Sequence, residues 1–129
     1  MMKLPVYLTR VRAGFPTPNE GEIEEKLDLN EYLIQHPAAT FFVRVEGSSM
    51  IDAGITEGDL LIVDRAKHPQ DGDVILAVLD GEFTVKRLSK QGKLFLEPAN
   101  QDFAPIEITE EMDFQVWGVV TYTVRKCSR

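Results

Sequence analysis

Ser49 is the first residue whose surroundings could support chemistry. It lies in the sequence VEGSSMIDAGI, directly after the apolar and β-branched stretch FFVRVE. A serine at a tight turn that leaves a strand exposes its hydroxyl oxygen, and neighbouring backbone N–H groups can then stabilise an oxyanion. Gly47 permits such a turn. We therefore interpret Ser49 as a candidate nucleophile, although Gly-Ser-Ser by itself is an ordinary loop sequence.

A nucleophilic serine needs a general base, and histidine is the usual one. The chain has two histidines, His36 and His68, and each directly precedes a proline. Such positions are typical of capping or surface residues, so a Ser-His-Asp triad is disfavoured. The alternative base is a lysine, which must be neutral to accept the proton. Its pKa must then fall from about 10.4 towards roughly 7 to 8, which requires an apolar and partly buried position.

Lys86 is the lysine with such a position. It lies inside the predicted strand EFTVKRL, whereas the others lie in the N-terminal arm, among glutamates, beside turns or near the C-terminus. Strand alternation places Thr84, Lys86 and Leu88 on one face and Phe83, Val85 and Arg87 on the other. A Lys86 that simply points into solvent remains the alternative.

The elements that must position these two residues are mostly β. From Ala39 onward, short runs rich in β-branched and aromatic residues alternate with turn residues: TFFVRVEG, DLLIVD, DVILAVLDGEFTVKRL, KLFLEP and FQVWGVVTYTV. Asp80-Gly81 predicts a two-residue hairpin turn, because Asp-Gly tolerates positive φ. We expect a compact folded or barrel-like sheet.

The first part of the chain has a different composition. Residues 1–29 read as a flexible N-terminal arm, with Phe15-Pro16-Thr17-Pro18 and no sustained period of 3.6 or 2. The stretch EIEEKLDLNEYLIQHP predicts one short helix, capped by Asp28 or Asn30 and ended by Pro37. Residues 30–129 are expected to form the folded domain.

Composition excludes several classes of protein. The formal net charge of −7 disfavours direct DNA binding, which depends on lysine and arginine. Cys127 is the only cysteine, so no disulfide framework or thiolate-rich metal site is expected. We predict no metal and no cofactor. No apolar run approaches the roughly 20 residues that span a bilayer, and no signal peptide is apparent, so a cytoplasmic protein is expected.

Together these segments resemble the self-cleaving serine peptidases of the UmuD and LexA family, which act in the SOS response. The matching segments are Ala13-Gly14 followed by FPTP, the block LNEYLIQHPAATFFVRVEGSSMIDAGITEGDLLIVDRA, DGEFTVKRL and WGVV. The resemblance covers most of the chain and implies a LexA-type peptidase fold.

The resemblance also implies roles for individual residues. Ser49 would be the nucleophile, Lys86 the general base and Ala13-Gly14 the bond that the chain cuts in itself. The backbone N–H groups of Ser49 and Met50 would stabilise the oxyanion. The small side chains of Ala13 and Gly14 suit an extended segment lying deep in a cleft.

The family has two branches. LexA and phage repressors carry a helix-turn-helix domain before the peptidase, and the 48 residues that precede Ser49 are too few and too rich in proline for one. The resemblance therefore narrows to UmuD-like proteins. It implies a homodimer whose self-cleavage is stimulated by a RecA filament. The processed dimer would then be an accessory subunit of a Y-family translesion polymerase, and no sequence-specific DNA binding is expected.

Three other interpretations stay open. The chain could be a non-catalytic acidic binding module that regulates a polymerase through its surfaces. It could be a relative of signal peptidases that cuts other proteins, which the lack of a membrane anchor disfavours. It could also be a generic β-barrel binding protein in which the serine and lysine coincide by chance.

Overall fold

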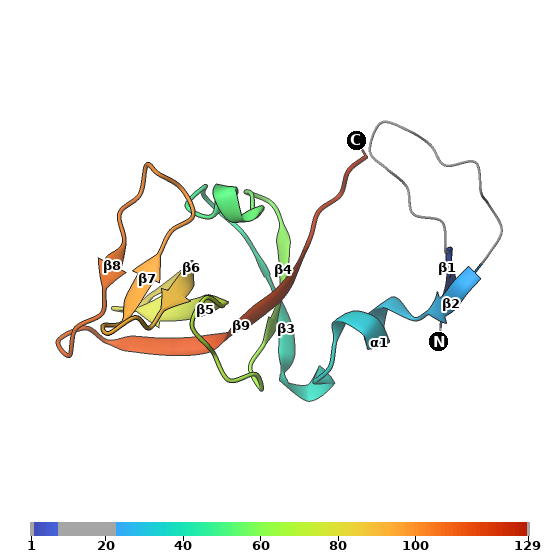
Figure 1. Ribbon diagram of the computed structural model, residues 1–129, viewed down its shortest axis with the longest axis horizontal. Coiled ribbons are helices and arrows are strands. Elements are labelled where there is room, and N and C mark those ends of the chain that lie inside the picture. The colour runs from blue at the N-terminus through green and yellow to red at the C-terminus, as the bar shows by residue number, and fades with distance from the viewer. Residues whose placement is uncertain (1, 8–22, 129) are drawn as a thin grey trace. The chain divides into compact units, whose positions relative to one another are not determined.

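The computed structural model describes residues 2–7 and 23–128 (Figure 1). The chain divides into two compact units, Met1–Gln35 and His36–Arg129. The division into an arm of residues 1–29 and a domain of residues 30–129 stays a prediction. The bond between Ala13 and Gly14 lies outside the described residues.

The first unit contains a pair of strands and a helix. β1 (Leu4–Tyr7) pairs antiparallel with β2 (Ile23–Leu27), a pairing that the short segment LPVY and the acidic segment IEEKL did not predict. Helix α1 spans Leu29–Leu33. It is shorter than the stretch predicted to be helical, because the first residues of that stretch belong to β2. Asp28 is the N-cap, and its carboxylate accepts a hydrogen bond from the N–H of Asn30 at 3.0 Å.

The second unit is built on one antiparallel sheet. A 3-10 turn, η1 (Pro37–Ala39), leads into it, and a second, η2 (Ile51–Ala53), follows β3. The strands are β3 (Thr40–Arg44), β4 (Leu60–Asp64), β5 (Val74–Leu79), β6 (Glu82–Ser89), β7 (Phe95–Glu97), β8 (Ile106–Glu107) and β9 (Phe114–Val124). Among the described residues they pair in the order β3-β4-β9-β5-β6-β7-β8.

β9 is the strand that joins the two halves of this sheet. It pairs with β4 along its C-terminal part and with β5 along its N-terminal part, as Figure 1 shows. Gly118 of β9 lies against β4: a Cβ there would be 2.6 Å from Val63 Cγ1 and 3.1 Å from the Asp64 carbonyl oxygen. Only glycine fits at this position without displacement of a neighbour.

The β5–β6 hairpin turns at Asp80-Gly81, as predicted. Both turn residues have positive φ, 49° for Asp80 and 86° for Gly81, which matches the twist of the flanking strands. The turn is also tied to the start of β9, since Asp80 and Asp113 exchange hydrogen bonds of 2.8 and 2.9 Å. β6 is thereby fixed in register, with Lys86 opposite Ile75 of β5.

The buried side chains form two clusters. One contains Met50, Ile55, Leu61, Val63 and Leu76, and the other contains Ile75, Ala77, Leu88 and Leu96. Consecutive residues of β5 alternate between the clusters, since Leu76 belongs to the first and Ile75 and Ala77 to the second, as expected for a sheet that is covered on both faces. A mostly β fold with one short helix is therefore confirmed. The sheet is not closed into a barrel, because β3 and β8 stand at its two ends without pairing to each other.

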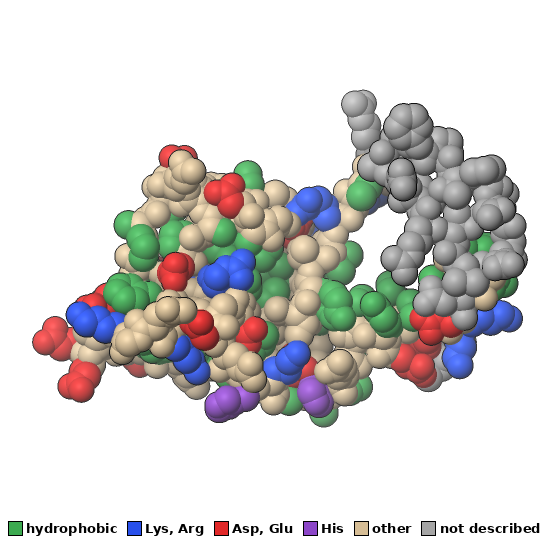
Figure 2. Space-filling model, viewed as in Figure 1, with side chains coloured by type: hydrophobic (Ala, Val, Ile, Leu, Met, Phe, Trp, Pro, Cys, Tyr) green, Lys and Arg blue, Asp and Glu red, His purple; other side chains and the backbone are tan. Residues whose placement is uncertain are grey.

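The surface carries charges of both signs. Figure 2 shows acidic side chains gathered at the end of the second unit that carries β8 and the loop before β9, where Glu110, Glu111 and Asp113 are exposed. Within the described residues, no helix combines the length and the apolar character needed to cross a membrane.

Candidate active site

Ser49 lies in the turn that connects β3 to η2. Gly47 has φ +85°, a left-handed conformation that turns the chain away from the strand. Met50 follows and is 3% exposed, with its side chain in the first core cluster. The buried methionine anchors the turn, while Ser49 stays partly exposed beside it.

Lys86 reaches Ser49 from the middle of β6. Its Nζ lies 3.0 Å from Ser49 Oγ, within hydrogen-bond distance. Two further acceptors surround the same nitrogen: Thr84 Oγ1 at 2.8 Å and the carbonyl oxygen of Val85 at 3.2 Å. Thr84 and Lys86 therefore share a face of β6, as strand alternation predicts.

Burial lowers the pKa of the Lys86 ammonium below its ordinary value. The cause is desolvation, because the lysine is half-buried and its three acceptors among the described residues carry no formal charge. No carboxylate of the described residues forms an ion pair with it. A half-buried lysine without a carboxylate partner loses its proton more easily than a lysine in water.

A cleft of about 340 Å³ opens over the two side chains. It is lined by Val43, Arg44, Val45, Glu46, Gly47, Ser49, Met50, Ile55, Leu76, Phe83, Thr84, Val85 and Lys86. Its walls are the edge of β3 with the residues that follow it and the part of β6 before Arg87, where pairing with β7 begins. The cleft thus lies between the serine turn that follows β3 and the first half of β6, with Leu76 of β5 also in its lining.

Comparison with protein families identifies the class of protein. A family model described as Peptidase S24-like matches residues 5–121, which include both Ser49 and Lys86. The chain belongs to this family. The resemblance to the UmuD and LexA peptidases is thereby confirmed at the level of the family, and the chain is a member of the serine peptidase superfamily.

Individual relatives of this peptidase S24-like chain align with it along nearly its whole length. Protein ImpA of Salmonella typhimurium is 46% identical over 122 residues, which cover 95% of this chain and 83% of ImpA. Protein MucA of Escherichia coli is 43% identical over 94% of this chain and 84% of MucA. The LexA repressor of Ectopseudomonas mendocina is 39% identical over 95% of this chain and 60% of the repressor.

In this member of the peptidase S24-like family, the turn that carries Ser49 is held from the loop after β7. The carbonyl of Ser48 accepts a hydrogen bond from Asn100 Nδ2 at 2.8 Å, and that of Ser49 accepts one from the Ala99 N–H at 2.8 Å. No hydrogen bond links the N–H of Ser49 or of Met50 to another described residue. Both N–H groups belong to residues that line the cleft.

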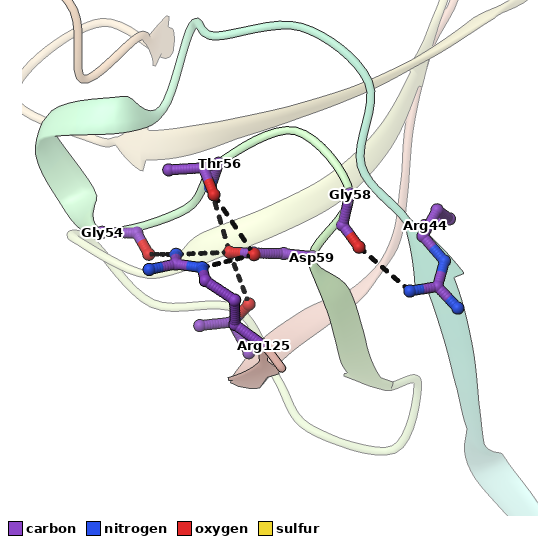
Figure 3. Close-up of polar contacts among 7 residues, drawn as sticks. Arg44, Gly54, Thr56, Gly58, Asp59 and Arg125 are labelled. Atoms are coloured by element: carbon purple, nitrogen blue, oxygen red, sulfur yellow. Dashed lines mark hydrogen bonds and ion pairs between the residues drawn. The ribbon is translucent and has the colours of Figure 1, made fainter. Parts of the chain in front are cut away.

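The segment that follows η2 is fastened to the end of β9 (Figure 3). Arg125 contacts both carboxylate oxygens of Asp59 at 2.7 Å and also donates to the carbonyl of Gly54. Thr56 and Thr123 donate further hydrogen bonds to the same carboxylate. Asp59 is 1% exposed, and its bonds to Arg125, above all, hold its pKa well below the usual range despite its burial.

The two histidines lie elsewhere, since neither lines the cleft. His36 Nδ1 is 2.6 Å from Asp64 Oδ2, so His36 pairs with a buried carboxylate at the end of β4. Burial alone would raise the pKa of Asp64, but hydrogen bonds from His36 and from the Ala66 N–H lower it. The described residues contain no cluster of histidine, cysteine and carboxylate side chains suited to a metal ion.

Sequence reasoning missed the residues that support the site. The sequence places Thr84 on the face of Lys86 without indicating a role for it, and it indicates no role for Asn100, Asp59 or Arg125. A signal existed for Asn100: the polar pair Asn-Gln follows Glu-Pro-Ala at the end of a strand, a typical setting for side chains that bond to backbone. The Asp59–Arg125 pair had no local signal, because the two residues are far apart in the sequence.

Proposed function

We propose that this protein is a self-cleaving serine endopeptidase in which Ser49 and Lys86 form the catalytic dyad and Ala13-Gly14 is the scissile bond. The observation that carries the proposal is the contact of 3.0 Å between Lys86 Nζ and Ser49 Oγ inside the cleft, together with the desolvation of the lysine. The scissile bond itself rests on the family resemblance.

The surroundings of Lys86 suit a neutral amine. A neutral lysine has two N–H donors and one lone pair. Thr84 Oγ1 and the Val85 carbonyl can take the two N–H groups, which leaves the lone pair directed at the Ser49 hydroxyl. The same geometry that stabilises the neutral form therefore prepares it to accept the serine's proton.

The reaction then runs in two stages. Ser49 Oγ attacks the carbonyl carbon of Ala13 as its proton passes to Lys86, and the N–H groups of Ser49 and Met50 stabilise the oxyanion. Collapse of the intermediate breaks the bond to Gly14, whose amine takes the proton back from Lys86. Water, deprotonated by Lys86, hydrolyses the ester between Ala13 and Ser49, and the serine is regenerated.

Cleavage would change the charge of the protein. Residues 1–13 carry Lys3, Arg10 and Arg12 and no acid, so their loss takes the formal charge from −7 to −10. By the family resemblance, the cut is stimulated by a RecA filament in the cytoplasm during the SOS response. The processed homodimer then serves as an accessory subunit of an error-prone Y-family translesion polymerase.

Incubation of the purified chain at alkaline pH tests the peptidase. Deprotonation of Lys86 should yield, without any partner, a fragment that starts at Gly14, detected by mass spectrometry. Ser49→Ala and Lys86→Ala variants should stay intact under the same conditions. Cleavage of either variant at the parent's rate would show that the dyad is assigned wrongly.

The acidic end of the second unit supports a second candidate, a binding module that works through its surface. The two proposals separate in one comparison. If the parent never cleaves under any condition, and the intact parent and the Ser49→Ala chain both still bind the polymerase subunit, the binding module is the better description.

A further inference from the structure

One short segment, Ala99–Asn100, donates hydrogen bonds to the carbonyl oxygens of both peptide groups beside Ser49. The Ser48 carbonyl also accepts a longer bond, 3.2 Å, from the Ile51 N–H of the same turn. Asn100 Nδ2 donates to the Ser48 carbonyl at 2.8 Å, and the Ala99 N–H donates to the Ser49 carbonyl at 2.8 Å. The segment follows β7 and lies about fifty residues further along the chain. Its contacts with the serine turn are therefore tertiary contacts.

Holding a carbonyl also fixes the N–H of the next residue. The peptide group is planar, and in its trans form the C=O of one residue and the N–H of the next point in opposite directions. The Ser48 carbonyl shares its plane with the Ser49 N–H, and the Ser49 carbonyl shares its plane with the Met50 N–H. The segment Ala99–Asn100 thus supplies, from outside the turn, contacts that orient the two N–H groups that the described residues leave without an acceptor.

The Asn100 side chain is itself held in one orientation. Its Oδ1 accepts a hydrogen bond from the Asp102 N–H at 2.9 Å, and its backbone carbonyl accepts one from the Phe103 N–H at 3.1 Å. With the amide oxygen occupied by Asp102, the amide nitrogen faces the Ser48 carbonyl. Asn100 is a donor in a fixed position.

We propose that Asn100 is a positioning residue that aims the Ser49 N–H at the oxyanion of the cleavage reaction. The inference rests on the proposed function and adds to it the residue that prepares the oxyanion site. Asn100 touches none of the reacting atoms and acts through the peptide group between Ser48 and Ser49. The Ala99 N–H orients the peptide group between Ser49 and Met50 in the same way, and with it the Met50 N–H.

The test is Asn100→Asp in the full-length chain. The aspartate keeps an oxygen for the Asp102 N–H, but it places a second oxygen against the Ser48 carbonyl where a donor stood. An oxyanion donor is worth about 10²–10³ in rate, so we expect the alkaline plateau of self-cleavage to fall on the order of tenfold to a hundredfold. The midpoint of the pH–rate profile, which reports Lys86, should not move.

Gln101→Glu is the matched control. It makes the same chemical change and adds the same charge at the next residue, which is exposed and forms no hydrogen bond with the described residues of the serine turn. It should cleave within about twofold of the parent, in line with surface substitutions. Asn100→Ser keeps the inference testable if Asn100→Asp misfolds. Its hydroxyl can still accept the Asp102 N–H, but the side chain is too short to reach the Ser48 carbonyl. It should show the same loss.

Two results would overturn the inference. One is cleavage of Asn100→Asp at the parent's rate; the other is a shift of the pH midpoint together with the rate, which would mean a disturbed Lys86. The amide NMR resonances of Ser49 and Met50 give a readout without cleavage: they should shift in Asn100→Asp while those of Leu60–Asp64 stay. If the parent itself never cleaves, the proposed function fails, and unchanged Ser49 and Met50 resonances would then reject the positioning role separately.

Discussion

Lys86 donates a hydrogen bond to Thr84 at 2.8 Å, two residues earlier on the same face of β6, and this bond is shorter than its contact of 3.0 Å with Ser49. Thr84 therefore holds the lysine side chain across the cleft. Thr84→Val keeps the shape of the residue and removes the acceptor. We expect alkaline self-cleavage to slow on the order of tenfold, because the lone pair of Lys86 is no longer aligned with the Ser49 hydroxyl.

Thr84→Ser checks that prediction. The serine retains the hydroxyl and should recover most of the parent's first-order rate, measured by gel densitometry of the intact chain. Equal rates for Thr84→Val and the parent would show that the hydrogen bond does not orient the lysine.

The lowered pKa of Lys86 also predicts how stability depends on pH. Between its folded pKa and its unfolded value near 10.5, the unfolded chain binds more protons, so this group adds stability as pH rises. Below the folded pKa the buried ammonium costs stability. Lys86→Met should therefore have a higher free energy of unfolding than the parent at neutral pH, and the difference should shrink as pH approaches 10.5.

Urea unfolding of both chains at several pH values measures that difference. Lys126→Met, at an exposed lysine, serves as the control and should change stability by less than about 0.5 kcal/mol. A difference between Lys86→Met and the parent that stays constant from neutral to alkaline pH would contradict the desolvation of Lys86.

Asp59 should make the second unit sensitive to acid. Its folded pKa lies well below the ordinary 3.8, so its contribution to stability is complete above that value and is lost as pH falls below it. Asp59→Asn removes charged hydrogen bonds to Arg125 and should cost about 2 kcal/mol at neutral pH. In chemical denaturation, the difference in free energy of unfolding between the parent and Asp59→Asn should narrow towards pH 3. A difference that grows there would contradict the lowered pKa of Asp59.

Gly118 should tolerate no side chain. In Gly118→Ala the new Cβ would meet Val63 Cγ1 at 2.6 Å and the Asp64 carbonyl oxygen at 3.1 Å. Overpacking of this kind typically costs about 1–3 kcal/mol, measurable as a lower midpoint of thermal unfolding. Because the closest clash is with Val63, Gly118→Ala should lower stability less in a Val63→Ala background. If the losses of stability from the two substitutions simply add, the clash with Val63 is not the source of the strain.

The sequence predicted the fold where the physical cause is local. Asp80-Gly81 specifies a hairpin because both residues accept positive φ, and Asp28 caps α1 through a bond only two residues long. The two-residue strand β8 and the pairing of β1 with β2 were missed, because such short segments carry too few residues to show a period. The sheet order, with β9 between β4 and β5, depends on contacts between distant segments and has no local signal.

The candidate site divides in the same way. By itself the sequence determined the residue types, a serine after a glycine turn and a lysine within a strand, and through them the family. Only the tertiary structure decided that Lys86 Nζ lies 3.0 Å from Ser49 Oγ, that the lysine is desolvated, and that Asn100 holds the serine turn. The reason is physical: a pKa and a peptide orientation depend on the atoms that surround them, and here those atoms come from β6, the β3–η2 turn and the loop after β7.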